Sequence, residues 1–372
     1  MNKQYKIPLF RDYPKLEKQL PYVSLATLPT PVERLEEIGD QLGLKNLYIK
    51  RDDLSGAVYG GNKVRKLEFL LGNILRSNSK QVITLGFAGS NHALATAIYA
   101  QQLGLRSVSL LMPQVNAHYV RRNLLASQYY NAKLCHYRNI TIMSLGIISQ
   151  FIKGKIKDGV FPRFIPAGGS CPLGVIGYVN AAMELKDQII AGKLPEPDLI
   201  YVPLGSMGTS AGLMLGIKAV GLKTRVIPIR VIEQKMASPK QMLRLISQTQ
   251  SLLRELDPAF TCVRFSKDDL YIRNDCLGKG YAHFTEKAVI AADIIKRKTG
   301  IILNGTYSAK AFSAIFDDAD RKILNGKTVL FWNTYNSRDL SKITAGIDYH
   351  NLPKEFHWYF EEDVQPLDKG KG

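Results

Sequence analysis

The chain of 372 residues has few cysteines and no long apolar segment. Cys135, Cys171, Cys262 and Cys276 are far apart and never occur in C-x-x-C spacing. This pattern argues against a zinc site or a disulfide framework, so we expect reduced thiols and no metal centre. We find no apolar run of signal-peptide length in residues 1–20, and no membrane-spanning stretch elsewhere. We therefore expect a soluble, cytoplasmic protein without a membrane partner.

Acidic residues are scarce compared with basic ones. The chain has 50 lysines and arginines against 32 acidic residues, which gives a formal net charge of +18. The basic residues are spread over the whole length, and the densest group, residues 153–157, has no interleaved aromatics. We interpret this charge as a solvated surface that attracts anionic ligands, and we expect no nucleic-acid partner. A basic binding protein without turnover is the alternative.

The sequence does have a regular alternation of strand-like and helix-like segments. Apolar runs predict strands at residues 47–50, 81–86, 106–112, 132–136, 199–204, 225–231 and 328–332. Strands separated by helices form parallel sheets that are covered on both faces. The length suffices for two such units. We expect an α/β fold with two three-layer αβα domains and mostly parallel sheets, and only the tail, residues 368–372, is predicted to be disordered.

One lysine lies at the predicted start of a helix. Gly60 and Gly61 allow a sharp turn, Asn62 suits a helix cap, and Lys63 begins an apolar-periodic run. A free lysine amine has a pKa of about 10.4, which the positive end of the helix dipole should lower. A neutral amine can react with a carbonyl group. Lys63 is therefore a candidate nucleophile, and an ordinary surface lysine is the alternative.

A phosphate cradle is predicted where an apolar strand meets the next helix. Gly205 and Gly208 let backbone amides converge around Met207, while Ser206 and Thr209 add hydroxyl donors. The helix dipole favours an anion at this place. The loop lacks the lysine of a Walker loop and does not follow the G-x-G-x-x-G pattern. Tight packing of helix on strand would also explain the glycines.

Two further loops carry polar groups. Ser90 and Asn91 begin a helix whose exposed amides suit a carboxylate, although helix capping alone would explain both residues. His92 could carry protons, but a single histidine at a helix start is more often packed. Tyr281 and Tyr307 lie beside glycine-rich loops, where a phenol either fills a core or acts as an acid or base.

A reactive lysine, a separate phosphate cradle and hydroxyl-rich loops together suggest pyridoxal 5'-phosphate as cofactor. The sequence resembles the fold-type II pyridoxal-phosphate enzymes, which share the tryptophan synthase β-like fold, and within them the D-cysteine desulfhydrase and 1-aminocyclopropane-1-carboxylate deaminase family. The matching motifs keep their order from about residue 30 to 312: Thr30-Pro31-Val32-Glu33, Tyr48-Ile49-Lys50-Arg51-Asp52-Asp53, Gly60-Gly61-Asn62-Lys63-x-Arg65-Lys66-Leu67-Glu68, Ser90-Asn91-His92, Ile165-Pro166-Ala167-Gly168-Gly169-Ser170, Gly205-Ser206-x-Gly208-Thr209-x-Ala211-Gly212, Gly280-Tyr281 and Tyr307-x-x-Lys310.

This resemblance implies roles for individual residues. Lys63 would hold the cofactor as an imine and later remove the proton from the substrate α-carbon. Ser90 would bind the substrate carboxylate, and Asn91 would hydrogen-bond the ring hydroxyl of the cofactor. Tyr281 and Tyr307 would face the substrate as acid–base groups. The cofactor phosphate would be bound by Lys66, Gly205, Ser206, Met207, Gly208 and Thr209.

Position 308 helps to choose within the family. Ser308 stands where the deaminases have glutamate and the desulfhydrases threonine, near the ring nitrogen of the cofactor. A hydroxyl holds that nitrogen protonated less strongly than a carboxylate does, which favours β-elimination over ring opening. His92, where the deaminases have glutamine, favours it as well. We expect a D-cysteine desulfhydrase-like lyase that forms pyruvate and ammonia from a small amino acid. The alternatives are 1-aminocyclopropane-1-carboxylate deamination and a non-catalytic protein that binds pyridoxal phosphate or nucleic acid.

The resemblance also implies the domain organisation. A small domain, residues 66–163, would accompany a large cofactor-binding domain formed by residues 1–65 and 164–372, and the protein would be a homodimer. Substrate identity is left open, because loops expected to border the substrate depart from the family pattern. These loops are residues 87–89, 304–306 and 334–337.

Overall fold

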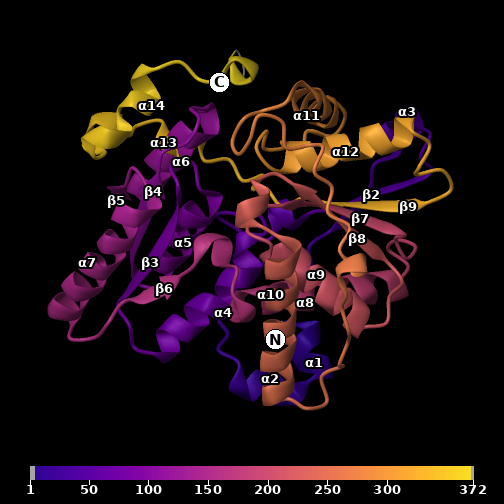
Figure 1. The fold of residues 1–372 in the computed structure, drawn as a ribbon, viewed down its shortest axis with the longest axis horizontal. Helices are drawn as coiled ribbons and strands as arrows, with labels where there is room; N and C mark the ends of the chain where they lie inside the picture. The colour runs from indigo at the N-terminus through magenta and orange to yellow at the C-terminus, as the bar shows by residue number, and fades with distance from the viewer. Residues whose placement is uncertain (1–4, 370–372) are drawn as a thin grey trace. The chain divides into compact units, whose positions relative to one another are not determined.

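The computed structural model describes residues 5–369, which form two compact units (Figure 1). The larger unit contains the described residues up to Leu20, Ala26–Phe69 and Ser170–Arg338. The smaller unit contains Pro21–Leu25, Leu70–Gly169 and the described residues from Asp339 onward. The sequence-based division at residues 65/66 and 163/164 stays a prediction, and the segment after residue 338 groups with the smaller unit.

The larger unit is built on a five-stranded sheet in the order β1-β2-β9-β7-β8. Its strands are β1 Val32–Arg34, β2 Asn46–Lys50, β7 Leu199–Leu204, β8 Arg225–Arg230 and β9 Thr328–Trp332. All neighbouring pairs are parallel except the edge pair β1 and β2. Strands β7 and β9 are buried along their whole length, as expected for a sheet covered on both faces. The predicted α/β fold is thus confirmed.

Helices of the larger unit bury this sheet and bring the β7–α9 loop into position. They are α1 Pro8–Asp12, α2 Pro14–Gln19, α3 Glu36–Leu42, the start of α4 Lys63–Arg76, α8 Pro172–Ile190, α9 Gly208–Ala219, α10 Pro239–Leu256, α11 Glu286–Thr299 and α12 Ser308–Asp320. Helix α9 packs closely on α8, since a Cβ added to Gly212 would lie 2.4 Å from the Cβ of Tyr178. This close approach requires glycine in α9.

The smaller unit has a fully parallel four-stranded sheet in the order β5-β4-β3-β6. Its strands are β3 Gln81–Phe87, β4 Arg106–Met112, β5 Lys133–His136 and β6 Arg163–Ile165. Its helices are α5 Asn91–Gln102, α6 His118–Tyr129, α7 Ile140–Asp158, α13 Ser341–Thr344 and α14 Trp358–Glu361. Apolar residues of β3 and β4, such as Ile83 and Leu110, pack with Met143 of α7 in its core.

The C-terminal segment is ordered further than its composition predicts. The carboxylate of Asp368 accepts a hydrogen bond from the backbone N–H of His118 over 2.7 Å. Lys369 forms an ion pair with Asp363. The predicted disorder is therefore wrong for Asp368 and Lys369, and residues 370–372 lie outside the described part of the chain. Among the helices that the structure describes, none combines the length and the apolar character needed to cross a membrane.

Candidate functional site

Lys63 is the first residue of α4 and follows a tight turn. Gly61 has a φ of 90°, and a Cβ at this position would lie 2.8 Å from the carbonyl oxygen of Thr334, so the turn requires glycine. Burial lowers the pKa of Lys63 to about 8. Roughly one amine in ten is then neutral at pH 7, compared with fewer than one in a thousand for a free lysine. Burial, rather than the helix dipole predicted from the sequence, is the cause of this lowered pKa in the structure.

The amide of Asn62 connects Lys63 to the β7–α9 loop. Its Oδ1 accepts a hydrogen bond from Lys63 Nζ over 2.7 Å, and its Nδ2 donates to Thr209 Oγ1 over 2.8 Å. These contacts use both ends of the amide, in place of the helix cap that was predicted. The amine of Lys63 therefore lies one side chain away from the first turn of α9.

The β7–α9 loop has the features of an anion site. Met207, the N-cap of α9, has a φ of 69°, which is rare for a residue with a side chain, and it provides no side-chain cap. The backbone N–H of Gly208 donates to Ser170 Oγ over 3.1 Å, and Ser170 donates to Ser206 Oγ over 2.8 Å. Ser210 Oγ in the same turn is buried without a hydrogen-bond partner among the described residues. This cluster of donors fits an anion.

Lys66 adds positive charge beside this turn. Its Nζ lies 3.4 Å from Ser170 Oγ, and a Cβ added to Gly208 would lie 2.8 Å from the same nitrogen. Burial, together with the nearby charge of Lys63, lowers the pKa of Lys66 well below its usual value. Two neighbouring amines near a helix N-terminus disfavour each other's protonation, and a bound dianion would relieve this effect. The residues present therefore fit a phosphate group.

Tyr281 and Tyr307 form a pair next to the same loop. Their hydroxyl groups are hydrogen-bonded to each other, and their ring centroids are 5.9 Å apart at an interplanar angle of 70°. Burial raises the pKa of Tyr307 to about 12, although the hydrogen bond to Tyr281 opposes the shift. The phenol of Tyr307 therefore keeps its proton at neutral pH. Its ring lies 3.5 Å from the position that a Cβ would take on Gly205.

Helix α12 follows Tyr307 and carries two further polar side chains. Ser308 is fully buried, and its Oγ accepts a hydrogen bond from the backbone N–H of Asn304 over 2.8 Å. Lys310 Nζ donates to the carbonyl oxygen of Leu277 over 2.7 Å, which ties α12 to the loop that precedes Tyr281. Burial lowers the pKa of Lys310 to about 8. The sequence motif included Lys310 without giving it a role.

The smaller unit contains Ser90, Asn91 and His92 at the start of α5. Ser90 is the N-cap, and its Oγ accepts a hydrogen bond from the backbone N–H of Ala93 over 3.1 Å. Asn91 Oδ1 accepts one from Asn123 Nδ2 over 2.8 Å. His92 is 3% exposed within α5, which supports a packed side chain rather than a proton carrier. The roles of Ser90 and Asn91 in binding substrate and cofactor stay predictions.

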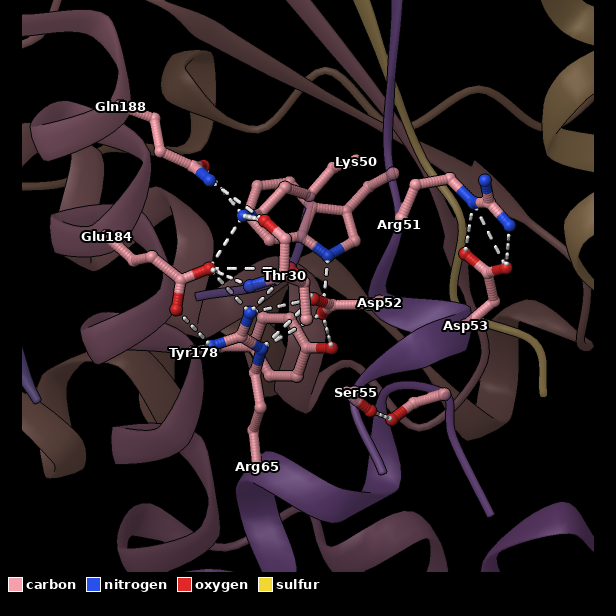
Figure 2. A network of polar contacts seen from close by, with 12 residues as sticks. Thr30, Lys50, Arg51, Asp52, Asp53, Ser55, Arg65, Tyr178, Glu184 and Gln188 are labelled. Carbon is pink, nitrogen blue, oxygen red and sulfur yellow. Dashed lines mark hydrogen bonds and ion pairs between the residues drawn. The ribbon is translucent and has the colours of Figure 1, made fainter. Parts of the chain in front are cut away.

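A buried network of charges holds the turn that carries Lys63 (Figure 2). Arg65 forms ion pairs with Asp52 over 2.8 Å and with Glu184 over 2.9 Å, and Lys50 pairs with Glu184 over 2.6 Å. All four side chains are at most 1% exposed. Asp52 also accepts hydrogen bonds from Tyr178 and Trp332. The network contains two acidic and two basic groups, so its formal charge is zero when all four are ionised. Sequence reasoning missed this network, because Lys50 and Asp52 occur in a run of charged residues that is typical of a surface.

Comparisons with known proteins identify relatives of this chain. Residues 23–334 match the family described as pyridoxal-phosphate dependent enzyme. A D-cysteine desulfhydrase of Salmonella choleraesuis is 30% identical over 323 residues, which cover 85% of this chain and 94% of the relative. A protein of Pyrococcus abyssi, provisionally named 1-aminocyclopropane-1-carboxylate deaminase, is 31% identical over 326 residues, which cover 87% and 94%.

Solved structures show the same relationship. A crystal structure of a 1-aminocyclopropane-1-carboxylate deaminase homologue matches with a TM-score of 0.73 at 30% identity, covering 89% of this chain and 95% of that one. The processed form of threonine deaminase isoform 2 from Solanum lycopersicum matches with a TM-score of 0.59 at 17% identity, covering 93% and 96%, which is a likeness of fold alone. The chain therefore belongs to the fold-type II pyridoxal-phosphate-dependent enzymes, in the family that contains 1-aminocyclopropane-1-carboxylate deaminase and D-cysteine desulfhydrase.

Proposed function

We propose that this protein is a lyase that eliminates the β-substituent of a small amino acid, with D-cysteine as the favoured substrate. The products would be pyruvate, ammonia and the leaving group. The observation that carries the proposal is the chain of contacts from Lys63 through Asn62 to Thr209, because it brings a reactive amine next to an anion site. One small molecule that carries an aldehyde and a phosphate could react with the amine and bind at the anion site at the same time.

The residues of the larger unit would hold the cofactor at its two ends. Lys63 would bind the aldehyde carbon, while Lys66, Ser206 and the amides of Gly208 and Thr209 would bind the phosphate. Bound pyridoxal phosphate supplies an electron sink for the negative charge that develops on the substrate α-carbon. With a pKa of about 8, the Nζ of Lys63 can both accept and release a proton near neutral pH.

The polar groups around α12 favour elimination. Ser308 offers a neutral hydroxyl that already accepts a hydrogen bond from Asn304, so it places no negative charge beside a ring nitrogen. Tyr307 keeps its proton because burial raises its pKa to about 12. Its protonated hydroxyl can therefore donate a hydrogen bond, directly or through Tyr281, to a departing sulfur that carries negative charge. Ring opening in the deaminase reaction is the second candidate, and it is supported by the 31% identity to the Pyrococcus protein.

A substrate panel tests the proposal. Purified protein loaded with pyridoxal phosphate is incubated with D-cysteine, L-cysteine and 1-aminocyclopropane-1-carboxylate, and keto acid and sulfide are measured. Pyruvate and sulfide are expected from D-cysteine, with activity lost in Lys63→Ala and retained in Lys153→Ala, a change at an exposed lysine. If only the cyclopropane substrate yields a keto acid, the protein is a deaminase. If none of the three yields a keto acid, the result supports a non-catalytic binding protein.

The proposal includes a homodimer located in the cytoplasm, with the larger unit as the cofactor-binding domain. Family membership supports these assignments. Sedimentation analysis at several concentrations tests the homodimer, since a mass near the 41.6 kDa of one chain would contradict it.

A further inference from the structure

Asn123, in α6 of the smaller unit, makes two hydrogen bonds at the junction of the β3–α5 loop with α5. The residue is 2% exposed. Its Nδ2 group donates to the carbonyl oxygen of Gly89 over 3.0 Å and to Asn91 Oδ1 over 2.8 Å. Gly89 belongs to the loop between β3 and α5, and Asn91 is the first residue of α5. None of the sequence motifs included Asn123.

The carbonyl group of Gly89 determines how the two amides are oriented. A backbone carbonyl can only accept hydrogen bonds, so the end of Asn123 that faces it must be the NH₂ group. The same NH₂ group faces Asn91, and Asn91 must therefore present Oδ1 to it. The other end of the Asn91 amide, which carries two N–H donors, consequently points away from Asn123.

Gly89 is held firmly enough to act as this reference. Its N–H donates to Gln114 Oε1 over 2.8 Å, and Gln114 Nε2 donates to the hydroxyl of Tyr119 over 2.7 Å. A Cβ added to Gly89 would lie 2.8 Å from both the Tyr119 ring and the Val120 side chain, so α6 packs directly on the glycine. The carbonyl of Gly89, and with it the orientation of both amides, is fixed from two sides.

We propose that Asn123 is a positioning residue that holds the side-chain amide of Asn91 as a hydrogen-bond donor toward the ring oxygen of the cofactor. The inference rests on the proposed function, which gives Asn91 this contact. An ionised ring oxygen needs a donor, whereas a flipped amide would present oxygen lone pairs to it and weaken binding. Asn123 acts only through Asn91, so its effect must vanish when Asn91 is absent.

A double-mutant cycle tests this dependence. Asn123→Ala, Asn91→Ala and the double variant are compared in the apparent dissociation constant of pyridoxal phosphate, measured by equilibrium dialysis. Each single change is expected to weaken binding about fivefold to tenfold, or about 1–1.4 kcal/mol, and the double variant should equal Asn91→Ala. The shape-preserving Asn123→Asp, which removes the donors, should weaken binding as much as Asn123→Ala. Asn180→Ala, which truncates a 2% exposed asparagine of the larger unit, is the matched control.

Two binding results would overturn the inference. In the first, the losses of affinity caused by Asn123→Ala and Asn91→Ala add independently. In the second, Asn123→Asp binds the cofactor as tightly as the unchanged protein. If the protein binds no pyridoxal phosphate, the proposed function fails, and the side-chain amide resonance of Asn91 in a ¹⁵N-labelled sample then decides the positioning itself. That resonance, identified by its loss in Asn91→Ala, should shift in Asn123→Ala and Asn123→Asp but stay in place in Asn180→Ala. An unchanged resonance would refute the inference.

Discussion

Replacing Arg65 by leucine should destabilise the larger unit strongly. The change removes the partner of Asp52 and one of the two basic partners of Glu184, in a place where all four charged side chains are at most 1% exposed. Removing one member of a buried ion pair typically costs about 3–5 kcal/mol, because the remaining charge is left without compensation. Lys50 would then be the one basic side chain of the network left to balance the two buried carboxylates of Asp52 and Glu184. We expect a loss of this size in the free energy of unfolding.

The pKa of Glu184 also reflects how strongly the network's ion pairs stabilise the folded state. Burial alone would raise this pKa, but Arg65 and Lys50 lower it from 4.5 to about 2. A lowered carboxyl pKa stabilises the folded state above the unfolded pKa, and this stabilisation is lost as the pH falls toward 2. At about 1.4 kcal/mol per pKa unit, the shift corresponds to about 3.5 kcal/mol near neutral pH, a contribution that Arg65 shares with Lys50.

Urea unfolding followed by tryptophan fluorescence measures this loss. The chain has two tryptophans, so Trp358→Phe leaves Trp332, which donates to Asp52, as the reporter of the network. Arg297→Leu is the matched control, because its ion pair with Asp293 spans 3.0 Å on the surface of α11 and should be worth less than 1 kcal/mol. If Arg65→Leu costs no more than this control, our account of the buried network is wrong.

Two further substitutions and one titration test the candidate site. Gly208→Ala would place a Cβ 2.6 Å from Ser170 Oγ, so pyridoxal phosphate should bind at least tenfold more weakly in dialysis; unchanged affinity would show that the phosphate lies elsewhere. The amine of Lys63 should react with trinitrobenzenesulfonate in protein without cofactor with a midpoint near pH 8, since burial lowers its pKa; a midpoint above pH 10 would contradict the assignment. Tyr307→Phe should lower kcat about 10²-fold with little change in KM, as expected for the loss of a hydrogen-bond donor to the charge that develops on the leaving group, and an unaffected kcat would remove Tyr307 from the mechanism.

The apolar pattern of the sequence predicted the described strands of four or more residues and missed the two that have three. The runs at residues 199–204 and 328–332 are continuously apolar, which is the pattern of a strand inside a covered parallel sheet, and both are strands in the structure. Strands β1 and β6 have only three residues each, too few for a periodic pattern. Their existence depends on pairing with neighbours, and the sequence does not encode that pairing locally.

The candidate site shows the same limit. Lys63 and the β7–α9 loop were found because glycines and hydroxyl groups cluster within a few residues of sequence. Asn62 and Ser170 were given no role in linking them, because their partners lie 147 and 38 residues away in the chain. The alternation of buried and exposed residues does not predict such contacts. Only the folded chain brings these residues together.

The neutral ion cluster around Arg65 fixes the orientation of the helix that begins with Lys63. Aliphatic side chains of similar volume could fill the same space and raise the melting temperature, but apolar surfaces tolerate several rotations of a helix about its axis. Paired charges with directional hydrogen bonds allow only one rotational position of the helix. We therefore expect apolar replacements at all four positions of the network to raise the free energy of unfolding, while the Lys63 side chain takes a less well-defined orientation. The four positions are Lys50, Asp52, Arg65 and Glu184.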